Sequence, residues 1–225
     1  MTTKAGVGTS RHHNPNIAGR EAAGQALEKA GIAKPDFVFM FASIDYDQPS
    51  LLRAVRETTG GTPLSGCSAE GTIDGDNADE SNFSVLITAI SSDELRWHNG
   101  LATGLRADSR AVGQQIAQEL LPHLSTGTID LFVFKEKIST RFDRMARQIK
   151  EQLGGERPRL IFQFECLTRG KLMFCEQEKQ ELLRRFRQSV GPDVPWAGFY
   201  TIGEIGSVEE HNDRHLYTSV VLALS

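Results

Sequence analysis

Short apolar runs alternate with amphipathic stretches along most of the chain. The run at residues 37–42 is continuous and apolar, which is typical of a strand covered on both faces. Apolar residues with helical spacing precede and follow this run, at about residues 17–30 and 49–58. Glycine lies just after each of these stretches, where a helix would end. Further strands are predicted at residues 83–90 and 129–134. This alternation predicts an α/β fold with mixed sheets and flanking helices.

The same order of elements returns in the second part of the chain. A helix, an apolar strand, a second helix, a Gly-containing segment and a last strand are predicted at residues 140–153, 159–164, 178–190, 194–205 and 218–224. We therefore expect an internal duplication, with halves at residues 1–137 and 138–225 and the run at 129–134 completing the first. A ligand site is expected between the halves. Short strand character is also predicted at residues 95–97.

Composition and charge narrow the class of protein. The chain has 225 residues, of which 39% are apolar and 24% charged, and its formal net charge is −4, so it has no general field for nucleic acid. It has neither an apolar leader nor a run of about 18 apolar residues, so we expect no membrane span and a cytoplasmic location. The 3 cysteines lack a CxxC pair and the 6 histidines lack HExxH, which predicts neither a disulfide framework nor a metal site.

A glycine-rich loop at residues 66–71 is the first candidate site. Its two glycines let backbone N–H groups approach an anion or carboxylate, although the same residues also suit a tight turn. The candidate ligand-binding residues here are Gly66, Cys67, Ser68 and Glu70. In the second copy, Gly203 and Glu204 form a comparable motif, and Glu70 and Glu204 would then occupy equivalent places. Each Glu could accept hydrogen bonds from a ligand amine or hold two loops together.

Cys166 and Arg169 follow the strand at residues 159–164, where α/β proteins commonly place a site. Arg169 can clamp a carboxylate through two hydrogen bonds, and the alternative is a structural salt bridge. A nucleophilic Cys166 or Cys67 needs a nearby base, for which His211 and His215 are the candidates in the second half. A buried, inert thiol is the alternative, and no catalytic constellation is recognisable.

Several motifs together resemble the FIST domain family. They include the GVGTS start at residues 6–10, the GCSAEG loop at 66–71, FECLTRG at 164–170, GFYTIGEI at 198–205 and the stretch beginning at His215. The chain is shorter than the resemblance leads us to expect. The likeness implies a sensory domain in signal transduction that binds small ligands such as amino acids, and it implies haem in some members, which sense nitric oxide.

Three functions follow from these observations. The preferred one is a cytoplasmic sensor whose amino-acid-like ligand binds between the halves and biases a partner such as a kinase or cyclase. Haem-dependent gas sensing is the second, because one histidine suffices as an axial ligand and Trp196, Phe199 and Tyr200 can wall a cavity or simply belong to the core. An enzyme using a Cys or Glu of the same loops is the third.

Overall fold

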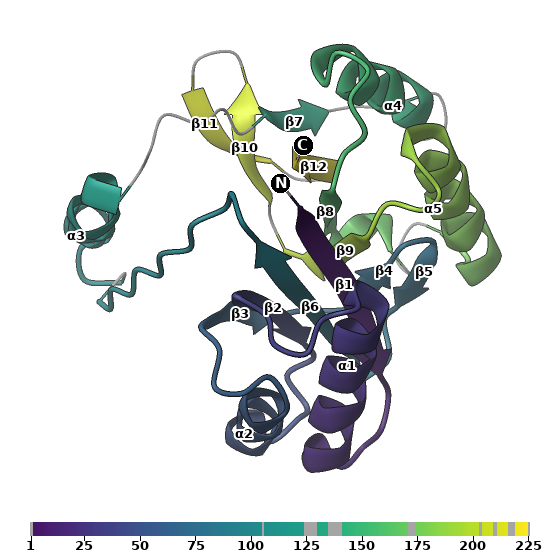
Figure 1. Ribbon diagram of the computed structural model, residues 1–225. Coiled ribbons are helices and arrows are strands. Elements are labelled where there is room, and N and C mark those ends of the chain that lie inside the picture. The colour runs from purple at the N-terminus through teal and green to yellow at the C-terminus, as the bar shows by residue number, and fades with distance from the viewer. Residues whose placement is uncertain are drawn as a thin grey trace.

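Two β-sheets stacked face to face, each covered by two helices on its outer side, form a four-layer arrangement (Figure 1). The computed structural model describes residues 2–104, 106–123, 130–134, 141–170, 174–202, 204–208, 211–215 and 219–224. The α/β class with mixed sheets, expected from the sequence, is confirmed.

The first sheet has four strands and carries α1 (Pro15–Ala30) and α2 (Gln48–Thr58) on its outer face. Its order is β1 (Thr3–Ser10), β6 (Val85–Ser92), β2 (Phe37–Ala42) and β3 (Leu64–Ser68), with only the β2–β3 pair parallel. Helix α1 begins where the Asn14 side chain accepts hydrogen bonds from the first helical N–H groups, and it ends at Gly31 in the left-handed conformation. Its buried face is nearly all alanine, which brings the helix close to glycines of β1.

The second sheet has six strands and carries α4 (Arg141–Gln152) and α5 (Glu176–Val190) on its outer face. Its order is β5 (Asn77–Asp79), β4 (Thr72–Asp74), β9 (Trp196–Thr201), β8 (Leu160–Cys166), β12 (Ser219–Leu224) and β7 (Asp130–Phe134). A separate two-stranded ladder joins β10 (Glu204–Val208) and β11 (His211–His215).

Aromatic side chains fill the space between the two sheets. The Phe39 and Phe162 ring centroids lie 4.9 Å apart, and those of Phe41 and Phe199 lie 4.4 Å apart. Phe164 packs on Phe199 in an edge-on contact. Such tilted ring pairs add stability beyond the area that they bury. This layer makes one structural unit of the two sheets.

The β4–β5 hairpin joins the halves by a second means. It comes from the first half of the chain, yet β4 pairs antiparallel with β9 in the second sheet. No strand was expected at these residues. The segment turns at Gly75, whose positive φ of 63° suits a two-residue hairpin loop, so turn chemistry outweighs the low strand propensity of the acidic residues.

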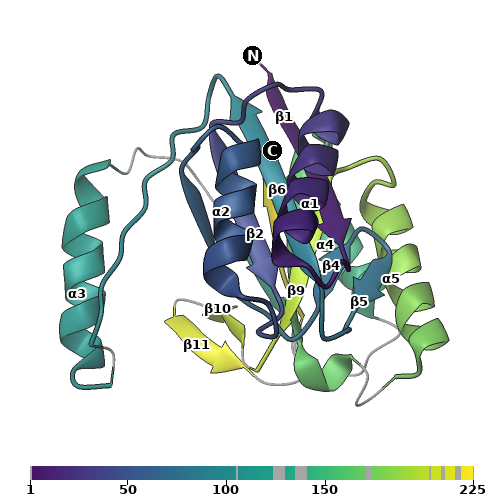
Figure 2. The ribbon, with the colours of Figure 1, turned by 90° about the horizontal axis from the view of Figure 1, so that it is seen from below.

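Two other expectations were wrong. Strand β7 pairs with β12, so the run predicted to complete the first half belongs to the second sheet. Residues 95–97 form no strand, because the Trp97 ring stacks on Phe37 at 4.7 Å and caps the aromatic layer instead of entering a ladder. The chain then runs out to α3 (Ser109–Leu120), followed by the short helix η1 (Leu121–His123), and α3 stands apart from both sheets (Figure 2).

The two sheets repeat one topology. The order β1-β6-β2-β3 matches β7-β12-β8-β9, with the same strand directions. Gly66 lies opposite Met40, and Gly198 lies opposite Gln163, and at both glycines a Cβ would collide with the partner's carbonyl oxygen. This register agrees with the predicted duplication, which stays a prediction. It also corrects one detail, because it aligns Glu70 with position 202 and not with Glu204.

The close approach at Gly198 leads to a stability prediction. Replacing Gly198 by Ala should lower the free energy of unfolding by about 3 kcal/mol, because the new methyl group meets the Gln163 carbonyl in the middle of a sheet. Urea unfolding followed by circular dichroism measures the change. Gly24→Ala is the matched control. Its Cβ meets nothing within 4 Å on α1, so it should raise stability by about 0.5–1 kcal/mol. Equal effects of the two substitutions would contradict this account.

Candidate functional site

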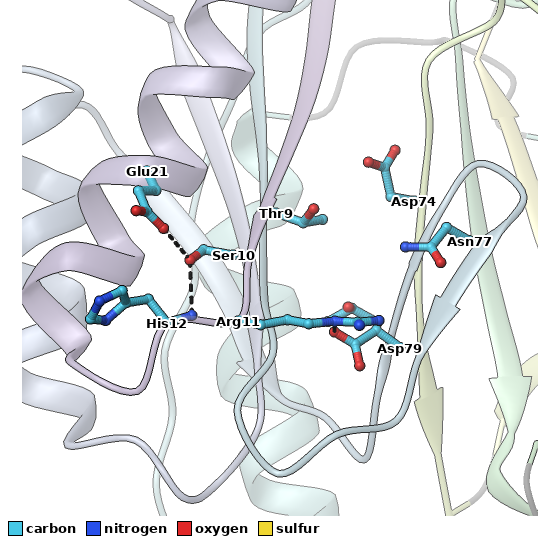
Figure 3. Close-up of a pocket in the computed structure, with 9 residues that line it drawn as sticks. Thr9, Ser10, Arg11, His12, Glu21, Asp74, Asn77 and Asp79 are labelled. Carbon is cyan, nitrogen blue, oxygen red and sulfur yellow. Dashed lines mark hydrogen bonds and ion pairs between the residues drawn. The ribbon is translucent and has the colours of Figure 1, made fainter.

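A polar cavity of about 410 Å³ lies where the end of β1 and the start of α1 face the β4–β5 hairpin (Figure 3). It therefore sits at the junction between the first sheet and a hairpin anchored in the second. Its lining residues are Thr9, Ser10, Arg11, His12, Glu21, Thr72, Asp74, Asn77 and Asp79. The volume is within the range of small-molecule sites, and the lining is unusually rich in carboxylates.

Hydrogen bonds fix the wall formed by β1 and α1. The Ser10 hydroxyl donates to Glu21 Oε2 at 2.6 Å and accepts from the His12 backbone N–H at 3.1 Å, as the dashed lines in Figure 3 show. The Tyr46 hydroxyl donates to the His12 carbonyl oxygen at 3.1 Å. Burial raises the pKa of Tyr46 to about 12, and the Asp79 and Glu21 carboxylates add to the shift. Tyr46 therefore stays a neutral donor near physiological pH.

An ion pair joins the two walls. Arg11 Nε lies 2.6 Å from Asp79 Oδ2, with the Arg11 side chain 63% exposed and that of Asp79 10% exposed. Burial alone would raise the pKa of Asp79, but the hydrogen bonds from Ser81 and Arg11 outweigh it, so the pKa of Asp79 is lowered. Asp79 is thus a carboxylate at neutral pH.

Asp74 behaves in the opposite way. Its burial raises the pKa of its carboxyl above the usual value, and the attraction of Lys29, whose Nζ lies 3.4 Å from Oδ2, offsets only part of that shift. A carboxylate that is poorly solvated and only loosely paired gains from a cationic group placed beside it. Asp74 is therefore the lining carboxylate best suited to bind an amine.

A second cluster of charged residues lies near the cavity, and all its members except Glu176 are almost fully buried. Lys179 of α5 pairs with Glu80, which directly follows β5, and both side chains are less than 5% exposed. Lys179 also pairs with Glu176 at 2.8 Å. Arg169 Nε donates to Glu165 Oε2 at 2.7 Å, again with both side chains less than 10% exposed. The cluster thus ties the hairpin of the first half to α5.

Hydrogen bonds extend this cluster into the core of the second sheet. Trp196 Nε1 donates to Gln163 Oε1 at 2.9 Å, and Gln163 Nε2 donates to Glu165 Oε1 at 2.6 Å. Burial raises the pKa of Tyr200, as do the nearby Glu165 and Glu80 carboxylates. The space left between these residues is only about 10 Å³, too little for a ligand. The arrangement is that of a structural ion network.

The residues selected from the loop at 66–71 lie elsewhere. Gly66, Cys67 and Ser68 line a separate groove of about 440 Å³ between β3 and α2. Glu70 is exposed, and its backbone N–H donates to the Tyr200 carbonyl oxygen at 3.1 Å. Cys67 is exposed along this groove, but partial desolvation of its thiol by the surrounding residues raises its pKa, which lowers its thiolate fraction.

The candidate residues of the second half do not all line the same space. Arg169 and Tyr200 line the closed space described above, whereas Cys166 is buried with its Sγ 3.0 Å from Thr168 Oγ1. Gly203 and the side chains of Glu204 and His215 lie outside the described part of the chain. The structure therefore places the predicted loop residues and Arg169 in different hollows.

Sequence reasoning missed the residues that line the cavity and the partners of Arg169 in the ion network, whereas the structural salt bridge weighed for Arg169 is the role that the structure shows. One signal was available for Glu165, which is a charged residue in an otherwise apolar strand, and another for Lys179, which falls on the buried face of α5. No pattern marked Arg11, Asp74 or Asp79, because their meeting depends on the hairpin crossing to the other sheet.

The cavity that contains His12 does not suit haem, and the side chains of His211 and His215 lie outside the described part of the chain. Haem needs an apolar cavity beside its axial ligand, but the cavity that contains His12 is lined by carboxylates and hydroxyls, and His12 Nδ1 accepts from the Asn14 N–H. Trp196 and Tyr200 are core residues, each 2% exposed. Within the described ranges, no group of three or more His, Cys, Asp or Glu is placed to hold a metal. Nor is any described helix long and apolar enough to cross a membrane.

Comparisons with known proteins identify two domain types. The model of the FIST N domain matches residues 36–161, more than half of the chain, and that of the FIST C domain matches residues 128–207. No curated protein matches the chain. A solved structure of an FtsZ-like protein of unknown function from Nostoc punctiforme is 16% identical, with a TM-score of 0.23, and the match covers 40% of this chain and 89% of that one. A likeness this low carries no argument.

The buried pair between Lys179 and Glu80 predicts a large effect on stability. Lys179→Met should lower the free energy of unfolding by about 3–5 kcal/mol, because it removes the lysine partner of a buried carboxylate. Chemical denaturation measures this loss. The double variant Lys179→Met with Glu80→Gln should recover part of it, since the carboxylate charge is then gone too. Arg185→Met on the exposed face of α5 is the control and should cost less than about 1 kcal/mol. A loss no greater than that of the control would refute the assignment.

Proposed function

Because the chain belongs to the FIST family, whose domains are sensory domains of signal transduction, we propose that it binds an amino-acid-like ligand in the cavity of Figure 3. The observation that carries this proposal is the pairing of opposite charges across a cavity of about 410 Å³. An amino acid presents an ammonium and a carboxylate a few bonds apart, and the cavity offers groups of both signs.

Each end of such a ligand has a suitable partner. Asp74 and Glu21 present carboxylates to the ammonium, and Asp74 is poorly solvated. Arg11 uses its Nε for Asp79, and its exposed guanidinium offers its terminal N–H groups to the ligand carboxylate. Three carboxylates line the cavity, and the cations beside them are Arg11 and, at Asp74, Lys29, so the site favours amine-bearing ligands over anions.

The β4–β5 hairpin supplies a route from the cavity to the second half. Asp79 faces the ligand cavity, and its neighbour Glu80 pairs with Lys179 of α5. A ligand that competes for Arg11 or Asp79 changes the position of the hairpin, and this change reaches α5 through the buried pair. Differential affinity for the two hairpin positions is what such coupling requires. The surface of α5 is then the part of the molecule that presents the signal to a partner such as a kinase or cyclase.

We also propose a cytoplasmic location. All three cysteines are free, one of them buried and two exposed, which suits a reducing compartment. An enzymatic role through Cys67 is disfavoured by the raised pKa of its thiol.

A thermal-shift panel of amino acids and diamines, with haemin included, tests the binding proposal. A true ligand at about 100 times its Kd should stabilise the protein by about 2.7 kcal/mol, and isothermal titration then measures the affinity. Asp74→Asn and Arg11→Met should each weaken binding about tenfold or more, because each removes a charge-assisted hydrogen bond. Arg56→Met on α2, outside the cavity, should bind as the unaltered protein does. If no amine-bearing compound stabilises the protein, or all three variants bind equally, the proposal fails.

The affinity should also depend on pH in a defined direction. The ammonium is held by the ionised form of Asp74, and burial raises the pKa of that carboxyl above the usual value for an aspartate. Affinity should therefore be full near pH 7.5 and fall on acidification, beginning at a higher pH than an ordinary Asp would give. Titrations between pH 7.5 and 4.5 measure this. The residual binding of Asp74→Asn should lack this drop. If the affinity of that variant fell with pH as it does in the unaltered protein, Asp74 would be excluded as the amine ligand.

A further inference from the structure

The outer edge of β3 has no strand beside it among the described residues. Strand β3 ends the order of the first sheet, and four of its five residues, 65–68, are exposed. Exposed edges with unpaired N–H and C=O groups are normally shielded, because they can pair with any other strand. One side-chain contact reaches this edge, from Asn99 Nδ2 to the Leu64 carbonyl oxygen at 3.2 Å. Within the described ranges, no other hydrogen bond reaches this outer edge.

The direction of the backbone groups along β3 follows from its bonds to β2. Val38 N donates to Pro63 O, and Ala69 N donates to Ala42 O, so residues 63, 65, 67 and 69 face β2. The N–H and C=O groups of residues 64, 66 and 68 therefore point outward. The backbone N–H and C=O groups of Gly66 and Ser68 are therefore oriented to pair with another strand.

The corresponding edge of the second sheet is covered. Strand β9 is the topological equivalent of β3, and the β4–β5 hairpin of the first half pairs with it. Tyr200 N donates to Gly71 O, Glu70 N donates to Tyr200 O, and Gly75 N donates to Trp196 O. The hairpin that follows β3 thus completes the sheet that contains β9.

The β10–β11 hairpin follows β9 in the chain, just as the β4–β5 hairpin follows β3. In the shared register Tyr200 corresponds to Ser68, and three residues separate Tyr200 from β10, just as three separate Ser68 from β4. The bond between Glu70 N and Tyr200 O shows that the ends of β3 and β9 lie side by side. A connection of this length that carries β4 from the end of β3 to the edge of β9 can carry β10 from the end of β9 to the edge of β3.

We propose that the β10–β11 hairpin closes onto the free edge of β3, with β10 antiparallel to it, so that the two halves exchange hairpins reciprocally. The equivalence fixes the register. Thr72 pairs with Phe199 and Ile73 with Gly198, so Glu204 lies opposite Cys67 and Ile205 lies opposite Gly66. The position of β10 beside β7 and β12 is then one of two that the hairpin occupies.

Closure joins candidate residues that are otherwise apart. It covers the groove lined by Gly66, Cys67 and Ser68, and it brings position 204 directly beside Cys67. Closure of the hairpin does not require ligand binding in the cavity of Figure 3, because strand order and backbone hydrogen bonds determine it.

Disulfide trapping tests the register with a native cysteine. Cys67 and a cysteine at position 204 would form a non-hydrogen-bonded antiparallel pair, whose Cα atoms lie about 4.5 Å apart, within the span of a disulfide. The variant Glu204→Cys, in a Cys175→Ser background, should form a disulfide within the monomer under mild oxidation. Non-reducing electrophoresis and peptide mass spectrometry detect it, and circular dichroism confirms folding of every variant.

The out-of-register control moves the first cysteine by two residues. Ser65→Cys with Cys67→Ser and Glu204→Cys should cross-link at least about tenfold more slowly, because diagonal neighbours lie about 7–8 Å apart. Equal rates for the two pairs would overturn the register. A cross-link found only between two molecules would assign the edge to a second copy, and no cross-link while both thiols react with a soluble reagent would refute closure altogether.

Hydrogen exchange of the unaltered protein gives a second readout without substitution. Closure should slow exchange of the Gly66 and Ser68 amides at least about tenfold relative to open edge amides, since their N–H groups then donate to β10. Exchange of these two amides at the rate of unstructured peptides would contradict the proposal.

Discussion

The aromatic layer between the two sheets is the constraint on which the rest of the structure depends. Phe39 and Phe41 of β2 meet Phe162 and Phe199 of the second sheet, so neither sheet can move far without exposing large apolar area. With both inner faces occupied, each sheet can accept helices only on its outer face. The four-layer order of helices and sheets follows directly from this single packing surface.

The same packing explains where polar chemistry can occur. The interior between the sheets is apolar, so charged groups gather where the β4–β5 hairpin leaves the first sheet and joins the second. On one side of the hairpin, Asp79 pairs with an exposed arginine in an open cavity. On the other side, Glu80 pairs with buried Lys179 in a closed network. One segment therefore connects a solvent-accessible cavity with a buried ionic contact to α5.

The ion network also shows how burial decides the role of a charged residue. Arg169 has the chemistry of a carboxylate clamp, but it is 9% exposed and holds Glu165 inside the protein. Arg11 is also an arginine, yet its side chain is 63% exposed and lines a cavity. Because a buried pair must satisfy itself internally, the buried arginine stabilises structure and the exposed one remains available to a ligand.

The sequence alone determined the α/β class, most helices and strands, and membership in the FIST family, because hydrophobic periodicity and short glycine motifs are local properties. The pairing of β7 with β12, the crossing of the β4–β5 hairpin to β9 and the resulting cavity were decided only by tertiary structure. Which edge a strand joins depends on contacts between residues far apart in the chain, and no local pattern encodes it. For that reason Arg11 and Asp79, 68 positions apart, became visible as a pair only in the fold.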